Sequence, residues 1–329
     1  MVISSNSTFQ RGAFNRKFFN KKLSALYHSQ TMNGLKAICG KQKNHIYFET
    51  GTAGRIVEMD PTLSHVDLLK FQISNAERVQ SLYTTYIDSS YCHIMAGNIP
   101  EIIQINLHDS SYCLFHPPGN LFSQSIVIDN SDYIFRQYQK SEGKWNQIFS
   151  KCNFITNTFI VNENVFDNSG DAGFSTDGVL LFDERTFCII YVEYYRNKFI
   201  CMDTLLRVLQ RGQTIDTFSN VTIKVLSEKL RYSQTITNTS PLHEINLQSK
   251  AVNGKLYIHS AIRADNESRM DFSGNAVIDV YQIPDGHYLG SFYIPNYNDQ
   301  RLKDFDVAAD KILVLYDNYI VVYSPPFNL

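Results

Sequence analysis

The acidic, histidine and serine side chains of this chain lack the spacing that catalytic or metal sites require. The sequence contains no G-x-S-x-G, H-E-x-x-H or G-x-x-x-x-G-K-[ST] segment, which are the signatures of serine hydrolases, zinc proteases and phosphate-binding loops. His45, His93 and His259 each stand alone in a strand-like run, where a histidine is usually structural. We therefore predict no catalytic residue and no metal ligand.

One glycine-rich segment, Gly51-Thr-Ala-Gly54, resembles a phosphate-binding loop in composition. It lies between the strand-like runs His45–Glu49 and Arg55–Met59, and no helix-forming segment follows it. A phosphate loop of this kind needs a helix N-terminus next to it. We therefore interpret the segment as a tight turn between two strands.

Arginine and tryptophan are the residue types through which this chain is best suited to bind a partner. A guanidinium group makes bidentate hydrogen bonds, an indole buries a large area, and both are enriched at the centres of interfaces. Residues of these types and one carboxylate lie in or beside predicted turns. We predict that the following residues form the binding site: Arg55, Arg78, Trp145, Arg196, Asp216, Arg263 and Arg301.

The composition indicates a folded chain with a nearly neutral surface. Hydrophobic residues make up 43% and charged residues 19%, with 20 Tyr and 22 Phe, which supports a large aromatic core and argues against disorder. The formal charge of -2 lacks the basic excess that is typical of nucleic-acid-binding proteins. We therefore expect a protein or peptide partner and no nucleic acid, while the oligomeric state is not set by the composition.

The cysteines and the N-terminal residues indicate where the protein works. The six cysteines are scattered without a C-x-x-C pair, which excludes a zinc ribbon and predicts mostly buried free thiols. Residues 1–22 are polar and basic, and we interpret them as a solvated flank. The chain has no apolar run of about 18 residues and no secretory signal, so we expect no membrane span. The sequence as it stands predicts a cytoplasmic protein. It predicts a periplasmic or surface-exposed protein if a signal or lipid anchor has been removed from it.

The elements that must position the binding residues are short β-strands in a repeating order. From residue 34 to residue 210, groups of four strand-like runs follow one another, as in Gly34–Gly40, His45–Glu49, Arg55–Met59 and Val66–Ile73. Runs rich in β-branched and aromatic residues, closed by Gly, Pro, Asn or Asp, are typical of strands joined by turns. Four such units precede a less regular stretch at 221–247, and a fifth follows that stretch.

The last unit has only three strand-like runs, which are Asp304–Ala308, Lys311–Asp317 and Tyr319–Ser324. A ring of four-stranded sheets leaves open edges unless its first and last sheets are joined. We therefore predict that a strand at Leu23–His28 supplies the missing fourth strand. The predicted architecture is an all-β, six-bladed β-propeller over residues 23–329, whose last blade is closed by an N-terminal strand.

Two segments near the C-terminus, VIDVYQIPDGHYLGSFYIP and LKDFDVAADKILVLYDNYIVVY, resemble blades of six-bladed β-propellers of the NHL and TolB-like type. In that type an outgoing strand ends in a D-G turn, and a returning strand leads into the next blade. The resemblance is clear over residues 275–324 and weaker over residues 34–210. Families of this type include lactonases, peptide and protein binders and assembly scaffolds, so the resemblance implies a fold and leaves the function open.

The preferred interpretation is a non-enzymatic binding or scaffold module that engages a protein or peptide. In a propeller, the loops after second strands and the loops between blades meet on one face, and the predicted binding residues fall there. The longest polar loops, Asn162–Ser175 and Asp265–Asn275, exceed what a blade turn needs and are expected contact or regulatory elements.

The alternative function is a metal-dependent hydrolase of the lactonase type, with Ca²⁺ bound at the central channel by oxygen ligands. The predicted inner strands offer only two acidic residues, Asp304 and Asp306, for such a site. We therefore predict no cofactor, and Ca²⁺ belongs to the alternative alone.

Two other folds fit the strand pattern less well. A seven-bladed ring would need residues 221–247 to form a blade of their own, and this stretch is too short for four strands and their turns. A pair of β-sandwiches would not explain the repeat.

Overall fold

The computed structural model describes most of the chain, namely residues 13–31, 34–42, 44–73, 79, 83–119, 121–141, 143–166, 171–221, 223–229, 234–240, 242–308 and 310–326. Within these ranges the ordered elements are β-strands and one short helix, α2 (Arg269–Gly274). No helix in these ranges is long and apolar enough to cross a membrane. The prediction of an all-β fold is confirmed.

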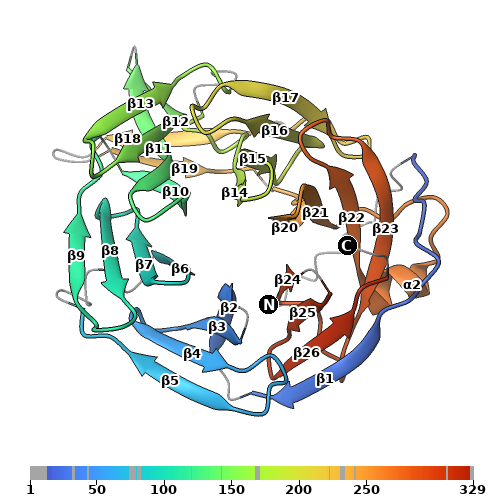
Figure 1. The fold of residues 1–329 in the computed structure, drawn as a ribbon. Coiled ribbons are helices and arrows are strands. Elements are labelled where there is room, and N and C mark those ends of the chain that lie inside the picture. The colour runs from blue at the N-terminus through green and yellow to red at the C-terminus, as the bar shows by residue number, and fades with distance from the viewer. Residues whose placement is uncertain are drawn as a thin grey trace, which may run out of the picture.

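Strands that follow one another along the chain pair in antiparallel order and form four-stranded units. In each unit one strand lies near the centre of the molecule and one lies at the rim (Figure 1). We call these units blades 1 to 6 and give the strands of each from the centre outwards. Blade 1 consists of β2 (Leu35–Gln42), β3 (His45–Thr50), β4 (Arg55–Met59) and β5 (Val66–Lys70), and blade 2 of β6 (Tyr83–Ile87), β7 (Tyr91–Ala96), β8 (Glu101–Asn106) and β9 (Tyr112–Phe115). Blade 3 consists of β10 (Phe122–Val127), β11 (Asp132–Ser141), β12 (Lys144–Asn153) and β13 (Thr158–Asn162), and blade 4 of β14 (Gly178–Asp183), β15 (Cys188–Glu193), β16 (Lys198–Met202) and β17 (Val208–Gln213). Blade 5 consists of β20 (Asn246–Val252), β21 (Lys255–Ser260), β22 (Asn275–Gln282) and β23 (Tyr288–Pro295), and blade 6 of β24 (Asp304–Val307), β25 (Ile312–Leu315), β26 (Tyr319–Ser324) and β1 (Ser24–Gln30).

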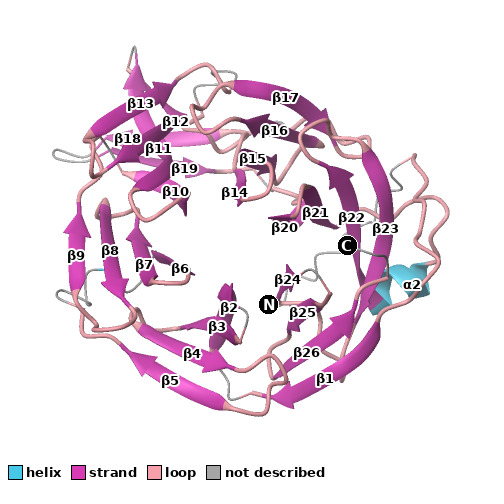
Figure 2. Cartoon of the chain, in the orientation of Figure 1, coloured by secondary structure: helices cyan, strands magenta, loops and turns pink. Residues whose placement is uncertain are grey.

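The blades stand around a common centre, and strands form nearly all of the ring (Figure 2). This arrangement is that of a β-propeller. Blades 1 and 2 also share one parallel pair, Gly40 with Ile87. A Cβ atom on Gly40 would lie 2.5 Å from the main-chain oxygen of Ile87, so only glycine allows the two inner strands to approach this closely.

Side chains near the centre join blade 6 to blade 1 and blade 1 to blade 2 by hydrogen bonds. The Oδ2 atom of Asp304 accepts a hydrogen bond from the N–H group of Ile38 at 2.8 Å. The Oε2 atom of Glu49 accepts one from the N–H group of Thr85, also at 2.8 Å. Because a buried N–H group without a partner costs about 1–3 kcal/mol, these bonds stabilise the inner edges of the sheets.

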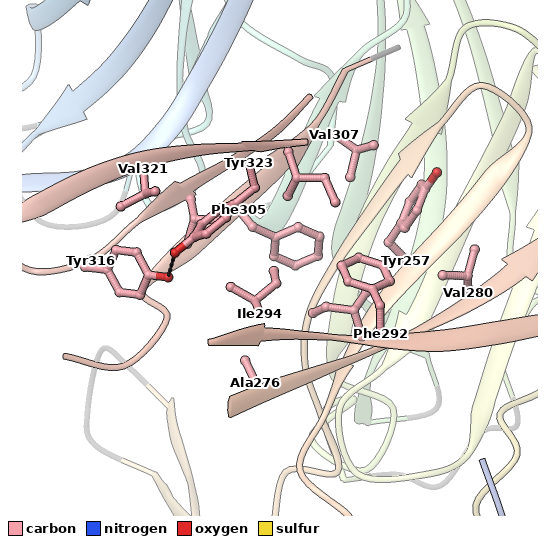
Figure 3. Packing of buried hydrophobic residues seen from close by; sticks show 13 residues of the cluster. Tyr257, Ala276, Val280, Phe292, Ile294, Phe305, Val307, Tyr316, Val321 and Tyr323 are labelled. Carbon is pink, nitrogen blue, oxygen red and sulfur yellow. Dashed lines mark hydrogen bonds between the residues drawn. The ribbon is translucent and has the colours of Figure 1, made fainter. Parts of the chain in front are cut away.

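Apolar side chains fill the spaces between neighbouring blades. Figure 3 shows the cluster between blades 5 and 6, where Tyr257 and Phe292 face Phe305 and Val307. The alternating strand pattern sends every second side chain toward one neighbouring blade, so each interface is packed from two sheets. The core is therefore a set of apolar layers between blades around the ring.

The last blade takes its outer strand from the N-terminal part of the chain. Strand β1 pairs antiparallel with β26, with Ser24 opposite Ser324 and Gln30 opposite Tyr319. This is the pairing that the incomplete last unit predicted, and it begins one residue after the predicted Leu23. It leaves β26 as an interior strand of the blade with a partner on each side.

The residues just before β1 are packed against blade 5, which corrects the prediction of a solvated flank for this part of residues 1–22. Arg16 has only 4% of its surface exposed. Its guanidinium group forms ion pairs with Asp279, at 2.8 Å, and with Glu267. The sequence-based interpretation failed because these partners lie far along the chain. Residues 1–12 of the predicted flank lie outside the described residues.

Among its described residues, the irregular stretch at 221–247 forms no blade of its own, and only its last two residues belong to a blade, as the start of β20. It contains a hairpin of two strands, β18 (Val225–Lys229) and β19 (Gln234–Asn238), which pair only with each other. This agrees with the expectation that the stretch is too short for four strands. The six cysteines are free, and Cys113 is the exposed one.

Removal of residues 1–30 should abolish folding of the remaining chain. The deletion exposes the edge of β26 and leaves Asp279 and Glu267 buried without their cation, which costs several kcal/mol. Soluble yield and the thermal transition followed by near-ultraviolet circular dichroism test this, with the full chain measured in parallel. A truncated protein with an unchanged transition would contradict the role of β1.

The stability of the protein should fall between pH 6.5 and pH 4 through His259 of β21. Burial, and secondly the positive charge of Arg16, lower the pKa of His259 to about 4. The neutral form is therefore favoured in the folded state, so its stabilising contribution is present above the unfolded pKa of about 6.5 and is lost as the pH falls toward the folded pKa.

A His259→Gln variant isolates this effect from the titration of the carboxylates. Urea unfolding at pH 7, 5.5 and 4.5 should show that wild type loses more stability than the variant, by at most about 1.4 kcal/mol per pH unit. Parallel pH profiles for the two proteins would show that His259 does not titrate in this way.

Candidate functional site

The connections between strands differ in length on the two faces of the ring. Because successive strands run in opposite directions, the turns after second strands and the links between blades share one face, which we call the loop face. The longest connections, which are 71–82, 163–177, 214–245 and 261–274, all belong to it. On the other face, which we call the short-turn face, none is longer than 60–65. The loop face therefore carries the connections that are longer than a turn between neighbouring strands requires.

The predicted binding residues that the structure describes, all except Arg78, are on the loop face but are spread around the ring. Arg55 is exposed at the start of β4, and Arg301 is exposed between β23 and β24. Trp145 is half-buried at the start of β12, where Lys140 lies 5.7 Å from its ring. Arg78 lies outside the described residues. These residues share a face without forming one compact cluster.

Two of the predicted residues are internal. Asp216 is 5% exposed and accepts hydrogen bonds from the Thr214 hydroxyl group and, at 2.9 Å, from the N–H group of Phe218. Arg263 is 7% exposed and donates to the main-chain oxygen of Glu267 at 2.6 Å. Both side chains hold loops in shape, and their burial leaves little of them for a partner to contact.

An ion pair with Glu193 restrains the Arg196 side chain beside the turn between β15 and β16. Arg196 donates to Glu193 at 2.5 Å, and its side chain keeps 15% of its surface exposed. Burial raises the pKa of Glu193, and the charge of Arg196 opposes that rise. Asn246 donates to the main-chain oxygen atoms of Glu193, at 2.8 Å, and of Arg196, at 3.1 Å. Arg196 therefore presents only part of its guanidinium group to a partner.

A pocket of about 450 Å³ opens on the loop face at blade 3. Amide, hydroxyl and carboxylate side chains from β11, β12 and the 163–177 connection line it, together with one aromatic ring. The lining residues are Gln139, Ser141, Asn146, Gln147, Ile148, Glu163, Asn164, Phe166, Gly173 and Thr176. The predicted binding residue Trp145 is the chain neighbour of Asn146 in this lining.

A buried arginine holds the far wall of this pocket. Arg136 is 2% exposed and donates to the main-chain oxygen atoms of Gly173, at 2.8 Å, and of Thr176, at 3.2 Å. It also pairs with Asp177 at 3.1 Å, and its guanidinium carbon lies 5.7 Å from the centre of the Phe166 ring. Arg136 therefore fixes the 171–177 segment to blade 3, together with a main-chain hydrogen bond from Ala172 to Trp145 at 3.1 Å.

The lining of the pocket suits a polar, uncharged chain. Glutamine and asparagine amides each offer donors and an acceptor, which match the N–H and C=O groups of a peptide backbone. The Phe166 ring offers an apolar surface beside them. Glu163 is the one acidic lining residue, and its Oε1 atom accepts from Gln139 at 2.5 Å. The pocket can therefore bind an extended peptide segment mainly through neutral polar groups, with Glu163 as its one charged lining residue.

The two acidic residues of the inner strand β24 are paired with lysines. Lys250 donates to Asp304 at 3.0 Å, and Lys41 donates to Asp306 at 2.7 Å. Burial lowers the pKa of Lys250, but Asp304 and Asp306 raise it more, so its pKa stays above the usual value. Among the described residues no group of three His, Cys, Asp or Glu side chains is placed to hold a metal ion.

A second pocket of about 450 Å³ lies on the short-turn face between blades 1 and 2. Its lining includes Tyr47, Tyr91, His45 and His108. His45 is paired with Glu58, which lies outside this lining. The sequence predicted a lone structural histidine at position 45, and no nearby motif indicates that His45 borders a pocket.

The residues that shape the loop-face pocket were missed from the sequence, with the exception of Trp145 beside it. Arg136 sits in the apolar run Tyr133–Tyr138, and a charged residue at a buried strand position was the available signal. The predicted long loop Asn162–Ser175 does contribute Glu163, Asn164, Phe166 and Gly173 to the lining.

Comparisons with known proteins show the fold of this chain. No protein-family model matches it, and no curated protein sequence matches it. A solved structure of a member of the DUF4221 family from Bacteroides vulgatus has a TM-score of 0.55 and 12% identity, over 93% of this chain and 98% of that chain.

Two further similar structures are described as a lyase and as a WD40 domain. Virginiamycin B lyase from Staphylococcus aureus has a TM-score of 0.50 and 11% identity, over 92% of this chain and 99% of that chain. The Pan2 WD40 domain from Neurospora crassa has a TM-score of 0.50 and 8% identity, over 96% of this chain and 99% of that chain. At such low identity these likenesses establish the propeller fold alone.

An Arg136→Met variant should be less stable by about 2–3 kcal/mol, because it removes the buried hydrogen bonds from the guanidinium group to Gly173 and Thr176 and its ion pair with Asp177. Urea unfolding at pH 7 measures the loss. Arg207→Met is the matched control, since the Arg207 side chain is 73% exposed and its pairing with Asp203 should contribute less than about 1 kcal/mol. Equal stability losses in the two variants would contradict the role of Arg136.

Proposed function

We propose that this chain is a non-enzymatic binding module that engages a protein or peptide through its loop face. The observation that carries the proposal is the difference between the faces: every long connection lies on the loop face, and an amide-lined pocket opens there. Binding groups are commonly carried by long loops on a rigid scaffold.

The pocket at blade 3 supplies the chemistry of the proposed interface. The amide side chains of Gln139, Asn146 and Asn164 would pair with main-chain groups of an extended segment of the partner. Trp145 and Phe166 would contact its apolar side chains. The exposed Arg55 and Arg301 lie at other positions of the loop face and would contact acidic groups of a larger partner.

A protein partner is favoured over the other classes by charge. The formal charge of -2 gives no basic field for nucleic acid. The alternative of a Ca²⁺-dependent hydrolase gains no support from the inner strands, because the carboxylates of Asp304 and Asp306 are each neutralised by a lysine.

Selection of peptides from a random displayed library against the full chain tests this proposal. Dissociation constants of selected peptides should rise at least about tenfold for Trp145→Ala and Asn164→Ala, because each removes a contact from the pocket region. Isothermal titration calorimetry provides the constants, and melting temperatures verify that the variants are folded.

The matched control is His108→Ala, an exposed substitution at the pocket of the short-turn face, which should leave binding unchanged. The proposal is wrong if no peptide is selected. It is also wrong if selected peptides lose affinity for His108→Ala and keep it for both loop-face variants.

A further inference from the structure

The N-terminal segment is held on blade 5 in the way that a receptor holds a peptide. The Asn266 side chain accepts a hydrogen bond from the N–H group of Arg16 at 3.0 Å and donates to its C=O group at 2.8 Å. The N–H group of Asp265 donates to the main-chain oxygen of Phe14 at 2.8 Å. These contacts recognise the backbone of the segment in one fixed register.

The same segment adds to the edge of β23 through main-chain hydrogen bonds. Ser291 donates to the main-chain oxygen of Lys17 at 2.8 Å and accepts from the N–H group of Phe19 at 2.9 Å. Phe18 and Ser291 form a parallel bridge. Strand addition of this kind is a common mode of peptide recognition, in which the main chain gives affinity and side-chain pockets give specificity.

Two buried carboxylates select the arginine. The Arg16 Nε and Nη2 atoms donate to the two oxygens of Asp279 at 2.8 and 2.9 Å. The Nη1 atom donates to Glu267 and, at 2.9 Å, to the main-chain oxygen of Ile262. The side chains of Arg16 and Glu267 have no exposed surface, and that of Asp279 has 3%. Only a guanidinium group can satisfy this set of acceptors, because an ammonium group lacks the planar fork.

Aromatic contacts complete the recognition of the segment. The Phe18 ring stacks on Tyr293 with ring centres 4.6 Å apart. The Phe19 ring approaches Gly290 so closely that a Cβ atom there would lie 2.9 Å from it. Gly290 also has a φ of 152°, within the range that favours glycine. Blade 5 thus reads an R-x-F-F motif, which is supplied by residues 16–19, and binds the main chain of Phe14 before it.

We propose that blade 5 is a receptor site for this arginine-bearing motif and that it can take the motif from a second copy of the chain. The cis segment precedes β1 and is held by its own set of hydrogen bonds, so its release would leave the pairing of β1 with β26 intact. The matching sequence is present in every copy, and exchange of an identical element between protomers is a low-cost route to a dimer. The cis segment is favoured at low concentration because the chain keeps it close to the site.

A labelled peptide of residues 13–22 tests this site in the full chain. The Arg16→Ala variant vacates the guanidinium position, so it should bind the peptide at least about tenfold more tightly than wild type, whose own segment competes. The same peptide with Arg16 replaced by Ala should lose at least about tenfold in affinity for that variant. Fluorescence anisotropy gives both comparisons, and the loop-face variant Asn164→Ala in the Arg16→Ala chain is a control that should not change them.

A second variant keeps the test decisive if Arg16→Ala does not fold. Arg16→Lys retains the positive charge but not the planar fork, so its cis segment is weakened and the arginine peptide should displace it. The proposal is overturned if the folded variant does not bind the peptide, or if it binds the arginine and alanine peptides equally. These outcomes do not depend on the loop face, so they are separate from the test of the proposed function.

Discussion

The pairing of β1 with β26 is the contact on which the rest of the ring depends. Without β1 the last blade would end in an open edge, and the packing of blade 6 between its neighbours would lose its outer support. Arg16 reinforces this contact from the next blade, because its ion pairs with Asp279 and Glu267 hold the chain just before β1. Residues close to the two ends of the sequence are thereby joined in one blade, which makes the fold a closed assembly of short hairpins.

A closed ring of antiparallel blades gives two faces that are free to differ. Here the short-turn face carries only the turns that the strands need, whereas the loop face carries the hairpin of β18 and β19, helix α2 and the 163–177 connection. Arg136 converts the last of these into a pocket wall by binding the main chain at Gly173 and Thr176. The proposed binding function rests on this difference between the faces. The strands of the ring provide a rigid scaffold, and the long connections of the loop face provide the contacts with a partner.

The sequence predicted the strands and the closure because both depend on local signals. Runs such as Lys311–Asp317 and Tyr319–Ser324 carry their own turn residues, and the missing strand of the last unit could be inferred by counting. The site was harder to predict. Asp216 and Arg263 look like surface residues from their neighbours, yet they are buried by hydrogen bonds within their own loops.

Arg16 and Arg136 show the opposite error, because they make their decisive contacts with distant residues. Arg16 stands among Lys17, Lys21 and Lys22 in a basic segment, while its partner Asp279 lies on β22 of blade 5. No pattern within a window of the sequence connects the two. Charged residues that a fold buries are therefore the ones that sequence reasoning places least well, and in this chain they shape both proposed binding sites.

The most direct measurement of the central claim is amide hydrogen exchange of the full chain, followed by mass spectrometry, with and without a bound peptide. Binding through the loop face predicts added protection in residues 139–141, 143–148, 163–166 and 171–176, where the pocket lies, and no change in the turns 88–90 and 107–111 of the short-turn face. Protection confined to the short-turn face, or to the inner strands around the channel, would contradict the account.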